Sequence, residues 1–362
     1  MKLPLRLLYT ASALGSGADE SYRNLLARRA PGMREIAGDI PGRKIWFGSV
    51  TAELPQIADP HWNMRTNRLI ELAIAGGVAE AAAAAIAKYG ADRVGVVLGA
   101  SNTGIDEAET LVEEWLGSGE KPRELDFSMI ELGTPALYLA ERLGVKGPAY
   151  TVSTACSSSA KAFAAAARLI ESGACDAVVT GGVDSRCRFA MNGFQALGAL
   201  AEGRSRPFAE DRDGINLGEG VALFFLGKDG ESPVFLRGVG ETSDAYHVTA
   251  PDPEGSGAES AMREALAAAG LEPGDIDYVN FHGTGTQAND AMEMKAFNRV
   301  FPDRGARPRN ESTKDLTGHC LGAAGAIEAA ISYLRIERGE AKTALSSSFA
   351  FGGSNAVVCL SA

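Results

Sequence analysis

The stretch Thr151-Val-Ser-Thr-Ala-Cys156-Ser-Ser-Ser leads directly into a helix-forming segment, 157–173, whose residues are nearly all apolar and mostly alanine. A helix that is apolar around most of its circumference is buried between the layers of a fold. Small alanine side chains let sheets approach such a helix from both sides. This stretch therefore predicts a layered fold with a central helix, and it places Cys156 deep inside the protein at the N-terminus of that helix.

Short apolar runs alternate with Ala-rich segments along the rest of the chain. We expect strands at 94–98, 177–180, 221–226, 277–281 and 356–360, and helices at about 67–88, 157–172, 257–269, 290–300 and 324–337. This alternation predicts an α/β fold with largely parallel sheets. A polar, turn-rich segment, Gly227–Pro233, is the best candidate break between two halves, which we place at residues 1–228 and 229–362.

Composition narrows the class of protein. A chain of 362 residues exceeds what one core comfortably supports, so we expect two tightly joined halves or one large α/β unit. The net charge of −11 disfavours a general nucleic-acid role, and it means that any acidic partner must meet a local basic patch. Five cysteines without metal-ligand spacing favour free thiols in a reducing compartment. We expect a cytoplasmic protein, because residues 1–17 read better as a buried strand than as a signal peptide and no stretch reaches about 18 apolar residues.

Cys156 is the first candidate for chemistry. Backbone N–H groups at a helix N-terminus point toward such a side chain, and the helix dipole favours a thiolate there. The N–H of Cys156 can also donate to the oxyanion of an attacked carbonyl. An inert cysteine that caps the helix together with the serines is the alternative, and the stretch alone leaves both interpretations open. The remaining cysteines lack this context and are interpreted as core or surface thiols: Cys175, Cys187, Cys320 and Cys359.

Two histidines lie in Gly-rich segments further along the chain. His282 follows a predicted strand, in a loop whose glycines let a ligand approach the backbone, although a lone histidine is more often a satisfied core residue. His319 precedes another small-residue helix, with Lys314 in the loop before it and Glu328 inside the helix. A buried Glu in an apolar helix needs a cationic or hydrogen-bonding partner, and Lys314 is the obvious candidate.

Several motifs accompany these segments in a fixed order: Thr154-Ala-Cys156-Ser-Ser, Gly181-Gly182, Arg206–Gly214 with Leu217–Gly220, Ser243–His247, His282–Thr286, Lys314 to Gly325, and Phe349-Ala-Phe351-Gly-Gly. In this order they resemble the β-ketoacyl-acyl-carrier-protein synthases of type I/II, which have the thiolase fold. The resemblance covers most of the chain from about Arg65 onward. It implies two similar α/β halves in a five-layer α-β-α-β-α core, the first carrying the cysteine and the second both histidines.

The resemblance also implies a reaction, a decarboxylative Claisen condensation catalysed by an acyltransferase. Cys156 would accept an acyl chain from a carrier-protein thioester, while the backbone N–H groups of Cys156 and Phe351 stabilise the oxyanion. His282 and His319 would bind the malonyl thioester carbonyl as CO₂ leaves, and the enolate would attack the acyl-cysteine to give a 3-oxoacyl thioester. Lys314 would orient the second histidine. No metal is implied, because the two imidazoles do the electrophilic work.

Further roles follow from the same resemblance. Phe351 matches a gating phenylalanine, and Thr284 and Thr286 match threonines that hydrogen-bond the phosphopantetheine arm. This arm arrives attached to the acyl carrier protein, so no separate cofactor is expected. Arg65 and Arg68 lie three positions apart and match the carrier-docking region, although two ordinary solvated arginines are nearly as good an interpretation.

Partners and pathway are open at this level. Asp290 and Glu293 are interpreted as structural partners of a mobile loop rather than as acids or bases. A homodimer is expected, and a heterodimer with a related subunit is the alternative. The chain could itself be a partner subunit of the chain-length-factor kind, although such subunits typically lose the nucleophile that this chain keeps. An acyltransferase or hydrolase using the same cysteine would not need both histidines. Fatty-acid, polyene and polyketide synthesis all fit.

Overall fold

The strands form one large mixed sheet path that contains the same arrangement twice. The computed structural model describes residues 1–122, 124–302 and 307–362. Strand order along the path is β12-β11-β13-β14-β10-β1-β9-β7-β5-β6. The strands of the first half are β1 (Leu3–Ser12), β5 (Val94–Gly99), β6 (Ala149–Val152), β7 (Ala177–Asp184) and β9 (Gly220–Gly227). Those of the second half are β10 (Val234–Ser243), β11 (Tyr278–Asn280), β12 (Arg309–Glu311), β13 (Thr343–Phe349) and β14 (Ser354–Ser361).

Strand directions show that the two halves are repeats of one topology. In the first half β6, β5 and β7 are parallel, and β9 and β1 follow in antiparallel pairs. In the second half β12, β11 and β13 are parallel, and β14 and β10 follow in antiparallel pairs. The halves meet where β1 pairs with β10, with Leu3 opposite Leu236. The fold is therefore built from two similar α/β units, although the division between residues 228 and 229 stays a prediction.

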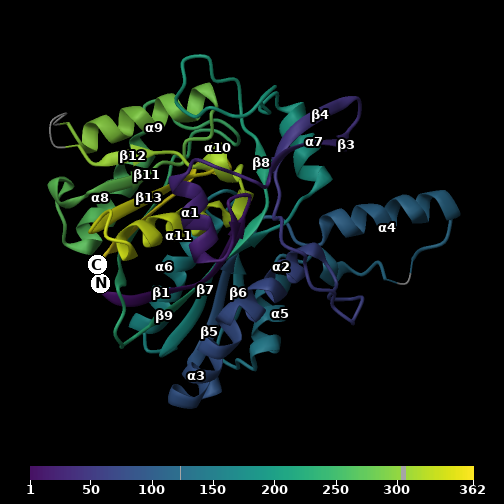
Figure 1. Cartoon of the computed structure of the whole chain (residues 1–362), viewed down its shortest axis with the longest axis horizontal. Coiled ribbons are helices and arrows are strands. Elements are labelled where there is room, and N and C mark those ends of the chain that lie inside the picture. The colour runs from purple at the N-terminus through teal and green to yellow at the C-terminus, as the bar shows by residue number, and fades with distance from the viewer. Residues whose placement is uncertain (123, 303–306) are drawn as a thin grey trace.

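Helices complete five layers (Figure 1). In the centre α6 (Ser158–Glu171) and α11 (Ala324–Glu337) contact each other and the strands of both halves. On the outer face of the first half lie α2 (Arg65–Ala73), α3 (Ala79–Tyr89) and α5 (Thr134–Leu143), and on that of the second half α8 (Ser256–Ala269) and α9 (Gln287–Val300). This arrangement confirms the thiolase-like α-β-α-β-α expectation.

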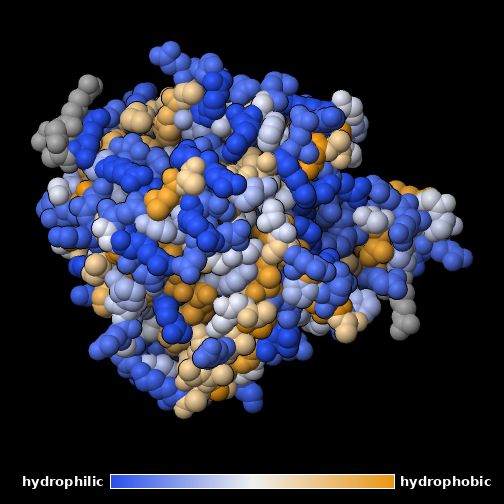
Figure 2. Space-filling model, viewed as in Figure 1, coloured by the Kyte–Doolittle hydropathy of each residue, from blue (hydrophilic) through white to orange (hydrophobic). Residues whose placement is uncertain are grey.

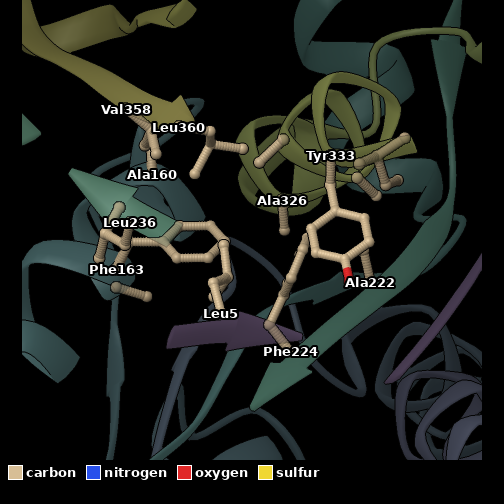
Figure 3. Packing of buried hydrophobic residues seen from close by; sticks show 14 of the residues in the cluster. Leu5, Ala160, Phe163, Ala222, Phe224, Leu236, Ala326, Tyr333, Val358 and Leu360 are labelled. Carbon is tan, nitrogen blue, oxygen red and sulfur yellow. The ribbon is translucent and has the colours of Figure 1, made fainter. Parts of the chain in front are cut away.

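Large aromatic side chains fill the space between the central helices and the sheet. Phe163 of α6 packs edge-to-face on Phe224 of β9, with ring centroids 5.0 Å apart, and Tyr333 of α11 lies on the other side of Phe224 (Figure 3). Alanines such as Ala160 and Ala326 occupy the closest approaches (Figure 3). Large rings beside small residues pack an interior without voids. The central helices are thereby held rigidly, and each begins beside the candidate site.

The expected helix at 67–88 is interrupted. Between α2 and α3 the chain makes one wide turn, Ile74–Val78, in which Gly77 has φ 122°. By length and composition the stretch Arg65–Tyr89 is apolar enough to cross a membrane, with a mean hydropathy of 1.8, so the expectation that no stretch reaches that length is wrong. Its many alanines raise the mean hydropathy, although each of them buries little apolar area. Leu69, Ile70 and Val78 within it belong to a hydrophobic cluster of the fold.

Several elements were not expected. They include α5, β6, β12 and β13, whose bounds are given above, and also β2 (Gly15–Ser16), α1 (Ala18–Leu26), β3 (Met33–Ile40), β4 (Arg43–Gly48), α4 (Ile105–Ser118), α7 (Arg188–Ala196), β8 (Leu217–Gly218) and α10 (Lys314–Thr317). Strands β3, β4 and β8 form a small separate sheet. Helix α4 projects away from the body of the molecule (Figure 1). The small sheet matters for the site, because β8 also bridges to His319.

Candidate active site

Cys156 lies in a tight elbow between β6 and α6. Ala155 before it has φ 52°, a left-handed conformation that costs a non-glycine residue about 1–2 kcal/mol. The hydroxyl of Ser158 holds this turn, since it accepts from the N–H of Thr154 (2.9 Å) and donates to the carbonyl of Ala155 (2.5 Å). Backbone strain that the surroundings hold in place is typical of functional sites. The elbow presents the Cys156 thiol to a cavity at the start of the central helix.

Both candidate histidines meet this thiol. Nε2 of His319 lies 3.0 Å from Sγ of Cys156. The rings of His282 and His319 are nearly perpendicular, with centroids 5.3 Å apart, and one nitrogen of each ring and the sulfur of Cys156 lie within 4.8 Å of one another. All three residues are buried. The structure therefore brings together the cysteine and the two histidines that were singled out from separate segments.

Lys314 contacts His282 rather than His319. Its Nζ lies 3.3 Å from Nδ1 of His282, and it also donates to the carbonyl of His282 and to a carboxylate oxygen of Glu328. The expectation that Lys314 orients the second histidine is thus wrong, whereas its expected pairing with Glu328 is confirmed. The three N–H bonds of an ammonium are matched by three acceptors. Because an ammonium only donates, Nδ1 of His282 accepts, and the ring proton is on Nε2.

This tautomer bears on whether the cluster is a metal site. Cys156, His282 and His319 are donor types that bind zinc, and their spacing is short enough to share an ion. A histidine binds metal through a nitrogen lone pair and usually donates its other N–H to an acceptor. Lys314 imposes the opposite arrangement on His282, with the proton on Nε2. His282 is therefore better suited to donate a hydrogen bond from Nε2 than to bind a metal there. That the reaction needs no metal stays a prediction.

Burial keeps all three groups neutral near pH 7. Burial raises the pKa of the Cys156 thiol to about 11, although the charge of Lys314 and the N–H of Phe351 act in the opposite direction. Desolvation therefore opposes the thiolate that the helix dipole was expected to favour at this position. Burial likewise lowers the pKa of both His282 and His319 well below the ordinary value, and the charge of Lys314 lowers it further. The resting site is a thiol facing two neutral imidazoles.

Phe351 contributes its backbone and its ring separately. Its backbone N–H lies near the sulfur of Cys156 and lowers the pKa of that thiol, so a donor is already close to the reacting atom. Its half-exposed ring lies 5.5 Å from that of Phe194 on α7. Gly352 and Gly353 follow with φ 80° and 73°, conformations that side chains rarely adopt. The ring therefore stands at the end of a Gly-rich turn beside the nucleophile.

A cavity of about 380 Å³ opens in front of these groups. Its lining includes Cys156, both histidines and Phe351, and it extends to Thr284 and Thr286. The hydroxyls of these two threonines lie 2.9 Å apart. Most of the lining surface is apolar, with further polar side chains such as Asp244 and Asn355 at its wall, which is typical of a small-molecule site. Sequence reasoning missed Phe194, because no motif marks it and only the packing of α7 brings it to the cavity.

Acidic residues of α9 hold the His282 loop from behind. The two carboxylate oxygens of Glu293 accept the N–H groups of His282 and Gly283, each at 2.7 Å. Asp290 accepts from the N–H groups of Phe208 and Gly285. Neither carboxylate faces the thiol. Their interpretation as structural partners rather than acids or bases agrees with these contacts.

The proposed docking arginines are committed to internal partners. Arg65 forms a two-point ion pair with the buried Glu219, and Arg68 donates to the carbonyls of Leu54 and Pro55. These internal bonds do not favour a basic docking patch, and carrier docking by this pair stays a prediction. Sequence reasoning gave Glu219 no role beyond its place in the motif Leu217–Gly220. A charged residue between two glycines is the sequence signal that could have marked it.

Comparisons with known proteins agree with this geometry. The N-terminal domain of beta-ketoacyl synthases matches residues 78–231, and their C-terminal domain matches residues 234–347. A 3-oxoacyl-[acyl-carrier-protein] synthase 2 from Staphylococcus aureus is 35% identical over 263 residues, which are 68% of this chain and 65% of that protein. Nodulation protein E from Rhizobium meliloti is 33% identical over 74% of this chain and 75% of its own.

Solved structures extend the similarity to the whole fold. A chain from the complex of the ketosynthase ApeO with its chain length factor ApeC, from Xenorhabdus doucetiae, has a TM-score of 0.92 and 38% identity, covering 99% of this chain and 98% of its own. A chain of the ishigamide ketosynthase/chain length factor has a TM-score of 0.89 and 27% identity, covering 100% and 99%. The matched domains contain the cysteine and both histidines of the cavity, and this chain belongs to the beta-ketoacyl synthase family.

Proposed function

We propose that the protein joins an acyl group to a malonyl group by decarboxylative Claisen condensation, giving a 3-oxoacyl thioester on an acyl carrier protein. The observation that carries this proposal is the meeting of one thiol with two imidazoles, one of which has its Nε2 proton fixed by Lys314. A hydrolase or simple acyltransferase needs a nucleophile and one base. The second imidazole, held as a donor, is what decarboxylation requires.

In the first half-reaction Cys156 takes the acyl chain. The thiol is neutral at rest and gives up its proton as the sulfur attacks the thioester carbonyl, while His319 keeps its own proton on the Nε2 that faces the sulfur. The N–H groups of Cys156 and Phe351 stabilise the resulting oxyanion. The proton then passes to the departing phosphopantetheine thiolate. No charge remains on the protein, which suits a buried site.

In the second half-reaction the malonyl thioester carbonyl lies between the imidazoles. His282 donates from Nε2, and His319 donates from the nitrogen that faces the sulfur. These bonds stabilise the enolate that forms as the carboxylate leaves as CO₂. The enolate carbon attacks the acyl-cysteine, the carbon–sulfur bond breaks, and the Cys156 thiolate takes up one proton from solvent. Thr284 and Thr286 line the cavity where the phosphopantetheine arm would lie. The carrier protein supplies this arm, and the proposed reaction uses no other prosthetic group.

A second subunit of this fold fits the exposed edge of the sheet. Strand β6 pairs with β5 on one side and ends the strand path on the other. Tyr150 of β6 is 37% exposed. The projecting segment formed by α4 and the residues after it, which we call the projecting arm, carries exposed Leu116 and Phe127 (80% and 72%). Apolar residues are visible on the projecting arm (Figure 2). Exposed apolar surface of this kind marks an interface. We propose a dimer here, with a second copy or with a related subunit like that of the ApeO–ApeC complex.

The pathway is proposed at the level of its chemistry. The relatives are a fatty-acid-type synthase, a nodulation protein and ketosynthases paired with chain length factors. Fatty-acid, polyene and polyketide assembly all use acyl and malonyl carrier thioesters, and we propose that this protein acts on them in the cytoplasm. The reaction is common to the three, and the acyl chain is what distinguishes them.

The direct test is product analysis with purified protein, an acyl-carrier thioester and malonyl-carrier. We expect an acylated protein first, and then a carrier-bound 3-oxoacyl chain two carbons longer, detected by mass spectrometry. Cys156→Ser should give neither. Free acid without elongation would instead support a hydrolase. A protein that never loads acyl groups, alone or with a partner chain, would support the chain-length-factor interpretation.

A further inference from the structure

The His319 ring contacts Cys156 through Nε2, but among the described residues no side chain holds its other nitrogen, Nδ1. Within the part of the chain that the structure describes, its Nδ1 is buried without a hydrogen bond. A catalytic histidine is usually oriented by a bond at the nitrogen that does not react. The orientation of His319 must therefore come from the position of its backbone. What holds that backbone is consequently part of the reaction's geometry.

The backbone of His319 is held on both sides by one segment. Its N–H donates to the carbonyl of Asn216 (2.7 Å), and its carbonyl accepts from the N–H of Gly218 (3.0 Å). These bonds make His319 an extra bridge on β8. The next residue, Cys320, donates its S–H to the carbonyl of Glu219 (3.4 Å). The segment Asn216–Glu219 is thus the frame on which His319 is mounted.

The Glu219 side chain anchors that frame. It is 1% exposed, and Arg65 reaches it with Nε at 2.6 Å and with a second nitrogen at 2.5 Å. The same carboxylate accepts the N–H groups of Val50 and Arg186, both at 3.1 Å. Every partner of the carboxylate is a donor, so only a charged or doubly accepting group fits. The Glu219 carboxylate thus connects β8 to the start of α2 and to the residues that follow β4 and β7.

We propose that the Arg65–Glu219 ion pair is a positioning element for His319, acting through Asn216–Glu219. The proposal rests on the proposed function, because it concerns the imidazole assigned to decarboxylation. Arg65 contacts neither Cys156 nor His282, so its loss moves His319 without removing a reacting group. A displacement of about 1 Å in a reacting group can cost about a hundredfold in rate.

The test compares two arginine variants on neighbouring helices. Arg65→Met breaks the proposed anchor. Arg142→Met breaks a matched two-point pair in which Arg142 bonds Glu71 of α2 at 2.5 and 3.2 Å, with no contact to β8. We expect Arg65→Met to lower malonyl-carrier decarboxylation ten- to a hundredfold while acyl loading changes less than about threefold. We expect Arg142→Met to leave the ratio of the two rates unchanged.

Two further variants separate positioning from general stability. Arg65→Met leaves the Glu219 carboxylate buried and uncompensated, which destabilises a fold strongly. The double variant Arg65→Met with Glu219→Gln removes both charges, so it should regain part of the thermal stability, although the amide accepts only one of the two backbone N–H groups, without regaining decarboxylation. Arg65→Lys keeps the charge but not the two-point geometry, and should recover an intermediate rate. A decarboxylation rate that followed thermal stability across these variants would overturn the proposal.

A spectroscopic measurement keeps this test independent of turnover. The chain has four histidines, so ¹⁵N-histidine labelling gives few ring signals, and His319→Ala identifies that of His319. We expect the His319 ring signal to shift in Arg65→Met and to stay in place in Arg142→Met. An unmoved signal in Arg65→Met would refute the positioning role. If the His319 signal shifted in Arg65→Met but the unmodified protein did not condense acyl and malonyl groups, the positioning role would stand and the proposed function would be refuted.

Discussion

Nε2 of His319 lies 3.0 Å from Sγ of Cys156, although the two residues are 163 positions apart in the chain. The repeated topology explains this meeting. Cys156 precedes α6 and His319 precedes α11, which are equivalent central helices of the two halves. A left-handed residue accompanies each of them, Ala155 with φ 52° and Leu321 with φ 50°. Each half thus contributes one elbow at the start of its central helix, and the nucleophile meets the histidine where the two elbows face each other.

The neutral resting thiol predicts a steep pH dependence of alkylation. Burial raises the pKa of Cys156 to about 11, so its thiolate fraction increases about tenfold per pH unit from pH 7 to pH 9. Iodoacetamide modification followed by mass spectrometry measures the rate, and Cys156→Ser corrects for the four other cysteines. A rate that levelled off below pH 8 would indicate a preformed thiolate and contradict the neutral site.

Lys314 and Glu328 should be far more sensitive to single than to double replacement. Each side chain is 2% exposed, so Lys314→Met or Glu328→Gln alone leaves a buried group without its partner, at a cost of about 3–5 kcal/mol in unfolding free energy. The double variant removes both charges and should lose less than either single variant. Urea unfolding measures this difference.

The same variants separate stability from chemistry. Lys314→Met removes the donor to Nδ1 of His282, so the Nε2 proton is no longer fixed. The double variant should therefore fold and still decarboxylate malonyl-carrier poorly. Normal decarboxylation by that variant would show that the tautomer of His282 does not depend on Lys314.

Glu293 should give the fold a characteristic pH dependence. Burial raises its pKa from 4.5 to about 8, so between these values the native state keeps a proton that the unfolded state releases. Its contribution to unfolding free energy therefore falls as pH rises through this window, by at most about 1.4 kcal/mol per unit. In Glu293→Gln this dependence is absent, and the amide loses one of two backbone N–H contacts at about 1–3 kcal/mol.

Urea unfolding at several pH values tests the Glu293 prediction. The stability advantage of the unmodified protein over Glu293→Gln should shrink steadily from pH 5 to pH 8. An advantage that stayed constant over this range would show that Glu293 is ionised throughout.

Phe351→Ala should separate the two contributions of that residue. The backbone N–H at the sulfur remains, so acyl loading of Cys156 should keep its order of magnitude. The ring that packs on Phe194 is lost, and water gains access to the acyl-enzyme. We expect a shorter acyl-enzyme lifetime by intact-mass spectrometry. An unchanged lifetime would show that the ring does not shield the thioester.

The central helices and the site residues were predictable, because their signals are local. The apolar pattern after Cys156 predicts α6, and the expected helix 324–337 coincides with α11. Helix α4 was missed because it projects from the body, so its exposed Trp115 and Leu116 follow no core-facing pattern. Helix α7 contains Asn192 and Gly193, which are weak helix formers.

The expectations about the site failed where two opposing effects set a pKa, or where loop geometry determines which residues are in contact. The sequence indicates both a helix dipole and deep burial at Cys156, which act on its pKa in opposite directions, and only their balance in the fold gives the neutral thiol. The four-residue helix α10 turns Lys314 toward His282, which the order of residues along the chain does not reveal. Arg65 lies at the start of a helix as expected, but its partner Glu219 is far away in sequence.

The most direct test of the account is the behaviour of His319→Ala in a single turnover. The variant is first acylated from an acyl-carrier thioester and then mixed with ¹³C-labelled malonyl-carrier, and both the mass of the protein and the release of CO₂ are followed. The account predicts that Cys156 loads normally, that CO₂ release falls by orders of magnitude, and that the acyl chain stays on the protein. Elongation at the rate of the unmodified protein would contradict the assignment of carbon–carbon bond formation to this pair of imidazoles.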